Sequence, residues 1–159
     1  MGHGRWRGGA GVEWIAVNEG STARMATSSS DGDEMLGKGA AGGWPTPPCR
    51  TYIERGGKRI RVKPHRMQPL EPGDRVIRLS SGGGGVGDPR ERPPEQVLED
   101  VRAGIISLPV ARDVYGVAID PDGLRIDQRL TAHLRAGGPR SRVRIAIEEP
   151  RLKVIVERD

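Results

Sequence analysis

Hydrophobic residues in the first half of the chain alternate with polar ones over short runs, a pattern typical of β-strands. The run from Val12 to Glu19 is rich in β-branched and aromatic residues and predicts a strand. Residues 22–27 are expected to pair back on it across the turn at Asn18-Glu19-Gly20. The run Arg75 to Leu79 follows a Pro-Gly turn and predicts another short strand.

A hairpin is predicted between these two strands. Residues 51–54 and 59–62 flank the pair Gly56-Gly57. Glycine pairs suit two-residue hairpin turns because such turns need positive φ angles.

Hydrophobic spacing changes to a helical period in the second half. Pro94 can occupy the first position of a helix over residues 95–102, with Gly104 as its stop. The apolar stripe of this helix is Val97, Leu98 and Val101. Ser107 is expected to cap a second helix over residues 108–115, which Gly116 ends.

The C-terminal part continues with a turn, a helix and an alternating tail. The turn is Asp120-Pro121-Asp122-Gly123, where proline fixes φ and glycine is expected to supply a positive φ between short strands at 117–119 and 124–126. Asp127 is expected to cap a helix over residues 128–135, closed by Gly137-Gly138. Residues 142–147 and 152–156 alternate around Pro150 and predict a late hairpin.

Two segments are too rich in glycine and proline for regular structure. Residues 37–48 should be extended or polyproline-like. The run Gly82-Gly83-Gly84-Gly85 loses much backbone entropy on folding. If it is ordered, another chain, a ligand or a packed extended segment must approach its backbone closely.

These patterns predict an α+β fold in which Gly-rich β-sheet and polyproline-like segments precede a small helical C-terminal region. The expected divisions are an opening β-strand segment (1–36), a Gly/Pro-rich connector with hairpin and glycine run (37–91), short helices with a β-turn (92–138) and an appended β tail (139–159). Leu, Ile and Val make up only about 21% of the chain, close to the level of roughly 20% at which disorder becomes the default. Buried surface borrowed from a partner would compensate for so thin a core.

Charge and cysteine content narrow the function classes. The net charge is +5, and positive residues are densest from Arg50 to Arg66, where seven basic side chains face Glu54 alone. This basic stripe fits a nucleic-acid-binding surface. A solvated strand pair or a face docked on an acidic subunit explains it better, because no helix-turn-helix, zinc-finger or RNP-type aromatic pattern accompanies the charge. Cys49 is the single cysteine, so no intrachain disulfide forms, and a reducing compartment is the simplest fit. No run of about 20 apolar residues is present to span a membrane, and we expect a cytoplasmic protein.

The segment GGGGVGDPRERPPEQVLEDVRAGIISLPVARDVYGV resembles the C-terminal signature of hydantoinase B/oxoprolinase proteins. Its matching positions include a glycine run, Gly-Asp-Pro, an acidic-basic pair, one helix and a second helix ending in Tyr-Gly-Val. We single out from it as structural or binding residues Gly82, Gly83, Gly84, Gly85, Gly87, Asp88, Pro89, Glu91, Arg92, Asp100, Tyr115 and Gly116. The runs Gly4 to Val12 and Gly37 to Pro48 are also similar to the family, so the resemblance covers roughly residues 2–136.

The resemblance implies a subunit rather than a complete catalyst. B-type subunits of this family work with an A-type, ATP-binding subunit to hydrolyse cyclic amides such as hydantoins or 5-oxoproline, and relatives carboxylate ketones. ATP and a divalent metal are expected in the full complex but none in this chain, whose partners would be the A-type subunit and the missing N-terminal B-type region. Family B chains are several times longer, and the match lies within their C-terminal third.

No catalytic or metal-binding cluster can be assigned from the sequence. His3, His65 and His133 are scattered and are expected at the surface. Cys49 is expected to be a plain thiol, and Asp120 and Asp122 to form a turn rather than a cation site. A phosphate cradle at residues 81–88 lacks the Gly-Lys-Ser/Thr pattern.

Three hypotheses remain. The chain is a C-terminal fragment or split subunit of an ATP-dependent hydantoinase/5-oxoprolinase-type hydrolase with a structural or assembly role, not active alone. Alternatively, it is a small basic nucleic-acid-binding protein or a non-functional truncated gene product.

Overall fold

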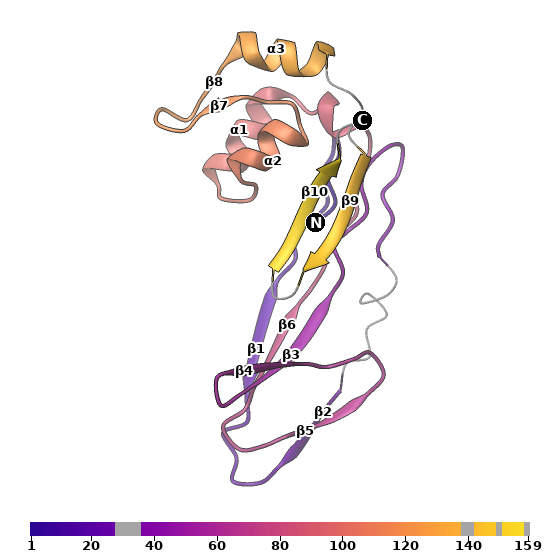
Figure 1. The fold of residues 1–159 in the computed structure, drawn as a ribbon, viewed down its shortest axis with the longest axis vertical. Coiled ribbons are helices and arrows are strands. Elements are labelled where there is room, and N and C mark those ends of the chain that lie inside the picture. The colour runs from indigo at the N-terminus through magenta and orange to yellow at the C-terminus, as the bar shows by residue number, and fades with distance from the viewer. Residues whose placement is uncertain (28–35, 138–141, 149–150, 158–159) are drawn as a thin grey trace.

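The computed structural model describes residues 1–27, 36–137, 142–148 and 151–157. It is elongated, with a sheet region at one end and helices at the other (Figure 1). The elements are, in chain order, β1 (Glu13–Val17), β2 (Arg24–Thr27), β3 (Arg50–Arg55), β4 (Lys58–Arg61), β5 (Met67–Leu70), β6 (Arg75–Leu79), the short 3-10 helix η2 (Pro89–Glu91), α1 (Pro94–Arg102), α2 (Leu108–Asp113), β7 (Ile119–Asp120), β8 (Arg125–Ile126), α3 (Gln128–Gly137), β9 (Arg142–Glu148) and β10 (Arg151–Glu157).

The main sheet is antiparallel with strand order β1-β6-β3-β4. The predicted hairpin is confirmed, because β3 pairs with β4 across Gly56 and Gly57, which have φ of +55° and +75°. The strands predicted at 12–19 and 75–79 are confirmed as β1 and β6, which pair with each other. The late hairpin is also confirmed, since β9 and β10 pair; Pro150 lies outside the described residues.

The predicted pairing of residues 22–27 with the first strand is wrong. Strand β2 pairs with β5, a strand that the hydrophobic pattern did not indicate. The buried side chain of Asn18 explains the redirection. Its Nδ2 donates to the carbonyl oxygens of Thr22 at 3.1 Å and Leu70 at 3.0 Å, which ties the end of β1 to the β2–β5 pair.

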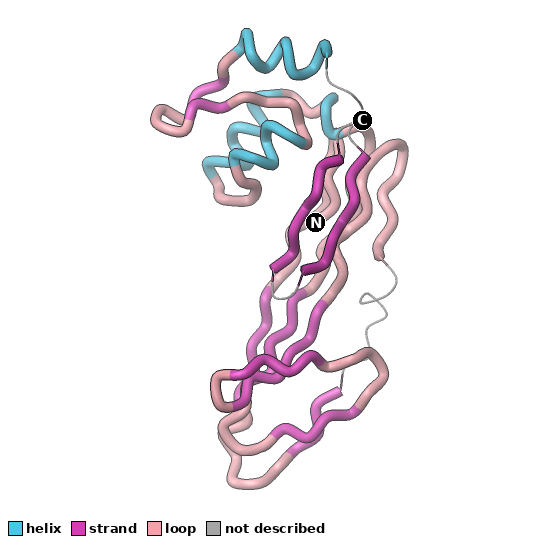
Figure 2. The backbone as a smooth tube through the Cα atoms, viewed as in Figure 1, coloured by secondary structure: helices cyan, strands magenta, loops and turns pink. Residues whose placement is uncertain are grey.

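Among the residues whose burial the structure describes, two separate hydrophobic cores form at the two ends of the molecule. One, beneath the sheet, consists of Ile53, Val62, Leu70 and Val76, with Ala26 packed against it. The other lies among the helices and contains Val97, Ile106, Ala111, Val114, Tyr115 and Val117. The backbone that connects the two ends is mostly loop in Figure 2. Contacts other than the hydrogen bonds of a regular β-sheet must therefore hold it together.

Three extended segments, residues 1–12, 37–48 and 80–88, make this connection, and we call them the glycine bundle. The glycine run lies in the middle and pairs on both sides. Gly83 accepts from the amide of Gly2 at 2.7 Å, while the amide of Gly85 donates to the carbonyl of Trp44 at 3.0 Å. The amide of Trp44 in turn donates to the carbonyl of His3 at 2.7 Å, which closes the bundle.

Glycine is required where these backbones touch. A Cβ on Gly85 would overlap the carbonyl oxygen of His3, and one on Gly43 would overlap the carbonyl of Gly85. The sequence left three explanations open for an ordered glycine run, and the structure confirms the packed extended segment.

Local signals place the helix ends well. Pro94 occupies the first position of α1, and Gly104 follows its end with φ +68°. Helix α2 ends at Asp113, two residues before the predicted end at Tyr115. Gly116, with φ +63°, completes the closing turn because the amide of Val117 bonds back to the carbonyl of Ala111 at 2.9 Å.

The third helix forms as predicted, but the turn before it differs from the prediction in one detail. Asp127 caps α3 as predicted, accepting from the amide of Leu130 at 2.9 Å. In the turn at residues 120–123, however, the positive φ falls on Leu124 (+43°) and not on Gly123. The carboxylate of Asp120 accepts from the amides of Asp122 and Gly123, both at 3.2 Å, and this holds the turn without a left-handed glycine.

We predict that Gly85→Ala destabilises the fold by about 2 kcal/mol or more, because the added methyl overlaps backbone that cannot move aside. Gly9→Ala is the matched control, since a Cβ there meets nothing within 4 Å and its φ is not positive. Urea unfolding of both variants measures the difference. Equal stabilities would contradict close backbone packing in the bundle.

Candidate functional site

A partly buried aromatic cluster forms where the N-terminal segment of the glycine bundle meets the helices. The His3 Nδ1 lies 3.0 Å from the hydroxyl of Tyr115, which is fully buried. The His3 ring also packs edge-on against the rings of Trp44 and Tyr115, at centroid distances of 5.5 and 5.4 Å. The expectation of a surface histidine is therefore wrong for His3, whereas His65 and His133 are exposed.

Burial sets the protonation of both partners. Burial, with a smaller contribution from the positive chain terminus, lowers the pKa of His3 to about 4. Burial likewise raises the pKa of Tyr115 to about 12. At neutral pH the imidazole is uncharged, and the Tyr115 hydroxyl, which accepts from the amide of Gly4, can donate to Nδ1.

Next to this cluster, one carboxylate holds two arginines. Asp100 on α1 is 5% exposed and accepts from Arg7 Nε at 3.0 Å and from Arg92 Nε at 3.1 Å. Arg92 is itself buried, and its Nη1 donates to the carbonyl of Arg5 at 3.0 Å. The Arg135 guanidinium on α3 donates to the Arg92 carbonyl at 2.7 Å. This network joins the glycine bundle to α1 and α3.

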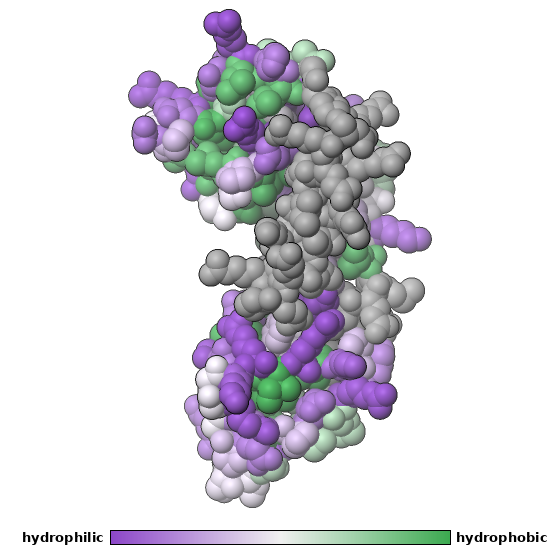
Figure 3. Space-filling model, viewed as in Figure 1, coloured by the Kyte–Doolittle hydropathy of each residue, from purple (hydrophilic) through white to green (hydrophobic). Residues whose placement is uncertain are grey.

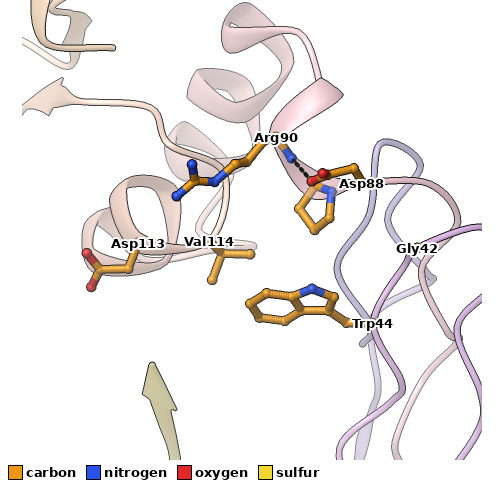
Figure 4. Close-up of a pocket in the computed structure, with 7 residues that line it drawn as sticks. Gly42, Trp44, Asp88, Arg90, Asp113 and Val114 are labelled. Carbon is orange, nitrogen blue, oxygen red and sulfur yellow. Dashed lines mark hydrogen bonds between the residues drawn. The ribbon is translucent and has the colours of Figure 1, made fainter. Parts of the chain in front are cut away.

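A cavity of about 380 Å³ opens between the bundle and the helices, lined by Gly42, Trp44, Asp88, Pro89, Arg90, Asp113 and Val114. Figure 4 shows the indole of Trp44 across from Val114, while the Asp113 carboxylate points away from it. Asp88 accepts from the Arg90 amide at 2.9 Å and so caps η2. The Arg90 side chain donates to the carbonyl of Leu134 at 3.2 Å. The side chains of Asp88 and Arg90 are thus both hydrogen-bonded to backbone atoms of the surrounding segments.

The predicted site residues divide into two groups. Arg92, Asp100 and Tyr115 converge on the two clusters described above. The others have local or packing contacts: Gly82 to Gly85 and Gly87 lie in the bundle, Pro89 is buried, and Glu91 is exposed with an ion pair to Arg5 at 3.9 Å. Gly116 lies beneath Arg135, whose Cγ would be 3.2 Å from a Cβ there.

Arg7 and Trp44 were not singled out from the sequence, and His3 was expected only as a surface residue. They lie in segments noted only for their glycine content, and Arg7 is 93 positions from Asp100. A weak signal existed in the Arg5-Trp6-Arg7 triplet, because bulky residues between glycines have to leave the crowded backbone and contact something else.

The basic stripe is partly neutralised. Glu54 accepts from Arg59 at 3.0 Å and from Arg75 at 2.8 Å. Asp74 bonds Arg55 at 3.0 Å, and this hydrogen bond lowers the pKa of the carboxyl and raises that of the guanidinium. Hydrophilic side chains surround the sheet end in the view of Figure 3. These ion pairs favour the interpretation as a strand pair with solvated charges.

Other candidates have structural explanations or no site geometry. Cys49 is buried, with its Sγ 3.5 Å from the hydroxyl of Ser81. Within the described ranges, no group of three or more His, Cys, Asp or Glu side chains could hold a metal ion. No helix in the part searched, which is the described residues, is long and apolar enough to cross a membrane.

Comparison with known proteins matches this chain to part of longer polypeptides. The family profile described as hydantoinase B/oxoprolinase matches residues 1–89. The chain is 35% identical to caprolactamase subunit beta of Pseudomonas jessenii over 140 residues, which is 85% of this chain but 24% of that subunit. It is 33% identical over 78 residues to the acetophenone carboxylase delta subunit of Aromatoleum aromaticum, covering 48% of this chain and 11% of that subunit.

A solved structure shows the same arrangement. The crystal structure of ATP-dependent caprolactamase from Pseudomonas jessenii matches with a TM-score of 0.68 at 31% identity, covering 85% of this chain and 24% of that one. The chain therefore spans about a quarter of the length of this relative.

We predict that Asp100→Ala lowers the free energy of unfolding by about 3 kcal/mol or more, because it leaves two arginines without their shared partner. The control is Glu99→Ala, at the preceding residue on α1. The ion pair of Glu99 with Arg102 is exposed and should contribute less than about 1 kcal/mol to the free energy of unfolding. Denaturant unfolding compares the two. Similar losses would show that the buried network does not hold the helices on the bundle.

We also predict that stability falls as the pH drops from about 6.5 towards 4. The folded pKa of His3 is lowered to about 4 from 6.5, so the unfolded state binds more protons within this window. The loss should be roughly 1–3 kcal/mol. Thermal unfolding against pH for the wild type and His3→Gln measures it, and the variant should show a flatter acid limb. Parallel profiles would contradict a His3 that is held neutral by its contacts in the folded state.

Proposed function

The chain belongs to the hydantoinase B/oxoprolinase family, and we propose that it forms one portion of a B-type subunit in an ATP-dependent complex that hydrolyses cyclic amides. The role of this portion is structural: it builds and positions part of the subunit and does not act alone. The names of the relatives support this proposal. One is a subunit of an ATP-dependent caprolactamase, a name that denotes a cyclic amide substrate.

The observation that supports a structural role is that the polar side chains of the two clusters are hydrogen-bonded to one another. Asp100, Arg92 and Arg7 bond one another, and His3 bonds Tyr115. An acid-base catalyst needs a group that can reach substrate, whereas these side chains are paired within the protein. They hold the bundle against the helices.

ATP and a divalent metal would then act elsewhere in the complex. The A-type subunit would bind ATP, and the part of the B-type polypeptide outside this chain would supply ligands for the metal. The substrate would be a hydantoin, 5-oxoproline or another lactam, because each contains the same cyclic amide bond. ATP would supply the phosphoryl group that makes the amide carbon reactive.

Co-purification tests this proposal. The tagged chain, expressed in its natural host, should bring down an A-type ATP-binding subunit together with polypeptide that corresponds to the rest of a B-type subunit. The recovered complex should hydrolyse a cyclic amide only with ATP, and the isolated chain should hydrolyse none. Salt-sensitive recovery of DNA or RNA without protein partners would contradict the proposal and support the nucleic-acid hypothesis instead.

A further inference from the structure

Strand β1 forms one border of the main sheet and is exposed to an unusual degree for a strand with apolar side chains. It pairs with β6 on one side, and no strand of the described residues pairs with it on the other. Trp14, Ile15 and Val17 are 55%, 43% and 48% exposed. Because successive side chains in a strand point to opposite faces, apolar surface is open on both faces of β1.

The backbone of β1 is also open. The amide of Ser80 donates to the carbonyl of Val12, and the amide of Asn18 donates to the carbonyl of Asp74, both at 2.9 Å. Even-numbered residues therefore face β6. In an antiparallel ladder the alternate residues face away, so the amides and carbonyls of Glu13, Ile15 and Val17 point outward.

The opposite border of the same sheet is built differently. Strand β4 has the sequence Lys-Arg-Ile-Arg, and all four residues are exposed. Basic side chains on an edge strand prevent pairing with other chains. Strand β1, with the sequence Glu-Trp-Ile-Ala-Val, has a single charge, so only one border of the sheet is open to a further strand.

We propose that β1 pairs with a strand from the part of the B-type polypeptide that lies outside this chain, and that this added strand extends the sheet. The proposal rests on the proposed function. The chain covers 24% of the caprolactamase subunit. About three quarters of a polypeptide of that length therefore lies outside this chain and is available to cover β1. The strand should have apolar side chains on both faces, opposite Trp14 and Ile15.

A matched pair of variants tests this proposal. Ile15→Lys places a charge on the β1 border, and Ile60→Lys places the same charge on the β4 border. The wild-type isoleucines are 43% and 41% exposed, so the two substitutions should perturb folding equally. Equal melting temperatures would verify this before binding is measured.

The binding probe is the partner polypeptide that the tagged wild-type chain recovers from its natural host in the co-purification described above. We expect Ile15→Lys to weaken binding of the full chain by about tenfold or more, as for a central interface residue, and Ile60→Lys by less than about twofold. On binding, amide hydrogen exchange should slow at Glu13, Ile15 and Val17 but not at Arg59, which lies on the other border.

The possible outcomes distinguish a failure of the pairing at β1 from a failure of the proposed function. Binding that both variants retain equally would overturn the pairing at β1 but leave the proposed function intact. Failure of the wild type to bind would contradict both. Self-association of the chain that Ile15→Lys abolishes, without binding to the probe, would show that a second copy occupies β1 and would overturn the proposal.

Discussion

Contact between bare backbones in the glycine bundle connects the two ends of this molecule. In the part of the chain that the structure describes, the sheet and the helices have separate hydrophobic cores, and neither core reaches the other. Between them, Gly85 lies against the carbonyl of His3, and Gly8 against that of Gly83. Such approaches are open only to residues without a Cβ. They also allow the central segment to bond both neighbours, which satisfies backbone groups that sheets or helices satisfy elsewhere.

Charged and aromatic side chains complete what the bundle begins. Glycine backbone cannot specify which helix packs on it, because it offers few side chains for recognition. Arg7 and His3 leave the bundle between glycines and contact Asp100 and Tyr115 on the helical side. These polar side chains are thereby hydrogen-bonded to one another across the boundary between the bundle and the helices. A structural use of these side chains agrees with the proposal that the chain is one portion of a larger subunit, since it covers about a quarter of the related caprolactamase subunit.

The sequence predicts best what depends on neighbouring residues. Gly56-Gly57 located the hairpin, and Pro94, Ser107 and Asp127 located helix starts, since turn and cap chemistry acts over a few positions. Family resemblance added Arg92, Asp100 and Tyr115 as residues of interest. Long-range pairing was not predictable: β2 meets β5 through the buried amide of Asn18, and no local pattern encodes that contact. His3 and Tyr115 are 112 positions apart, so the histidine was wrongly expected at the surface.

Native-state hydrogen exchange of the bundle amides tests the central claim most directly. The amides of Gly83, Gly85 and Gly87 donate to the carbonyls of Gly9, Trp44 and Ala40 at 3.0, 3.0 and 2.9 Å. If the bundle joins both ends cooperatively, these amides should be protected to the same degree as those of Val97 and Val114 in the helical core. Exchange at the rate of an unstructured peptide, with the helices still protected, would contradict the account.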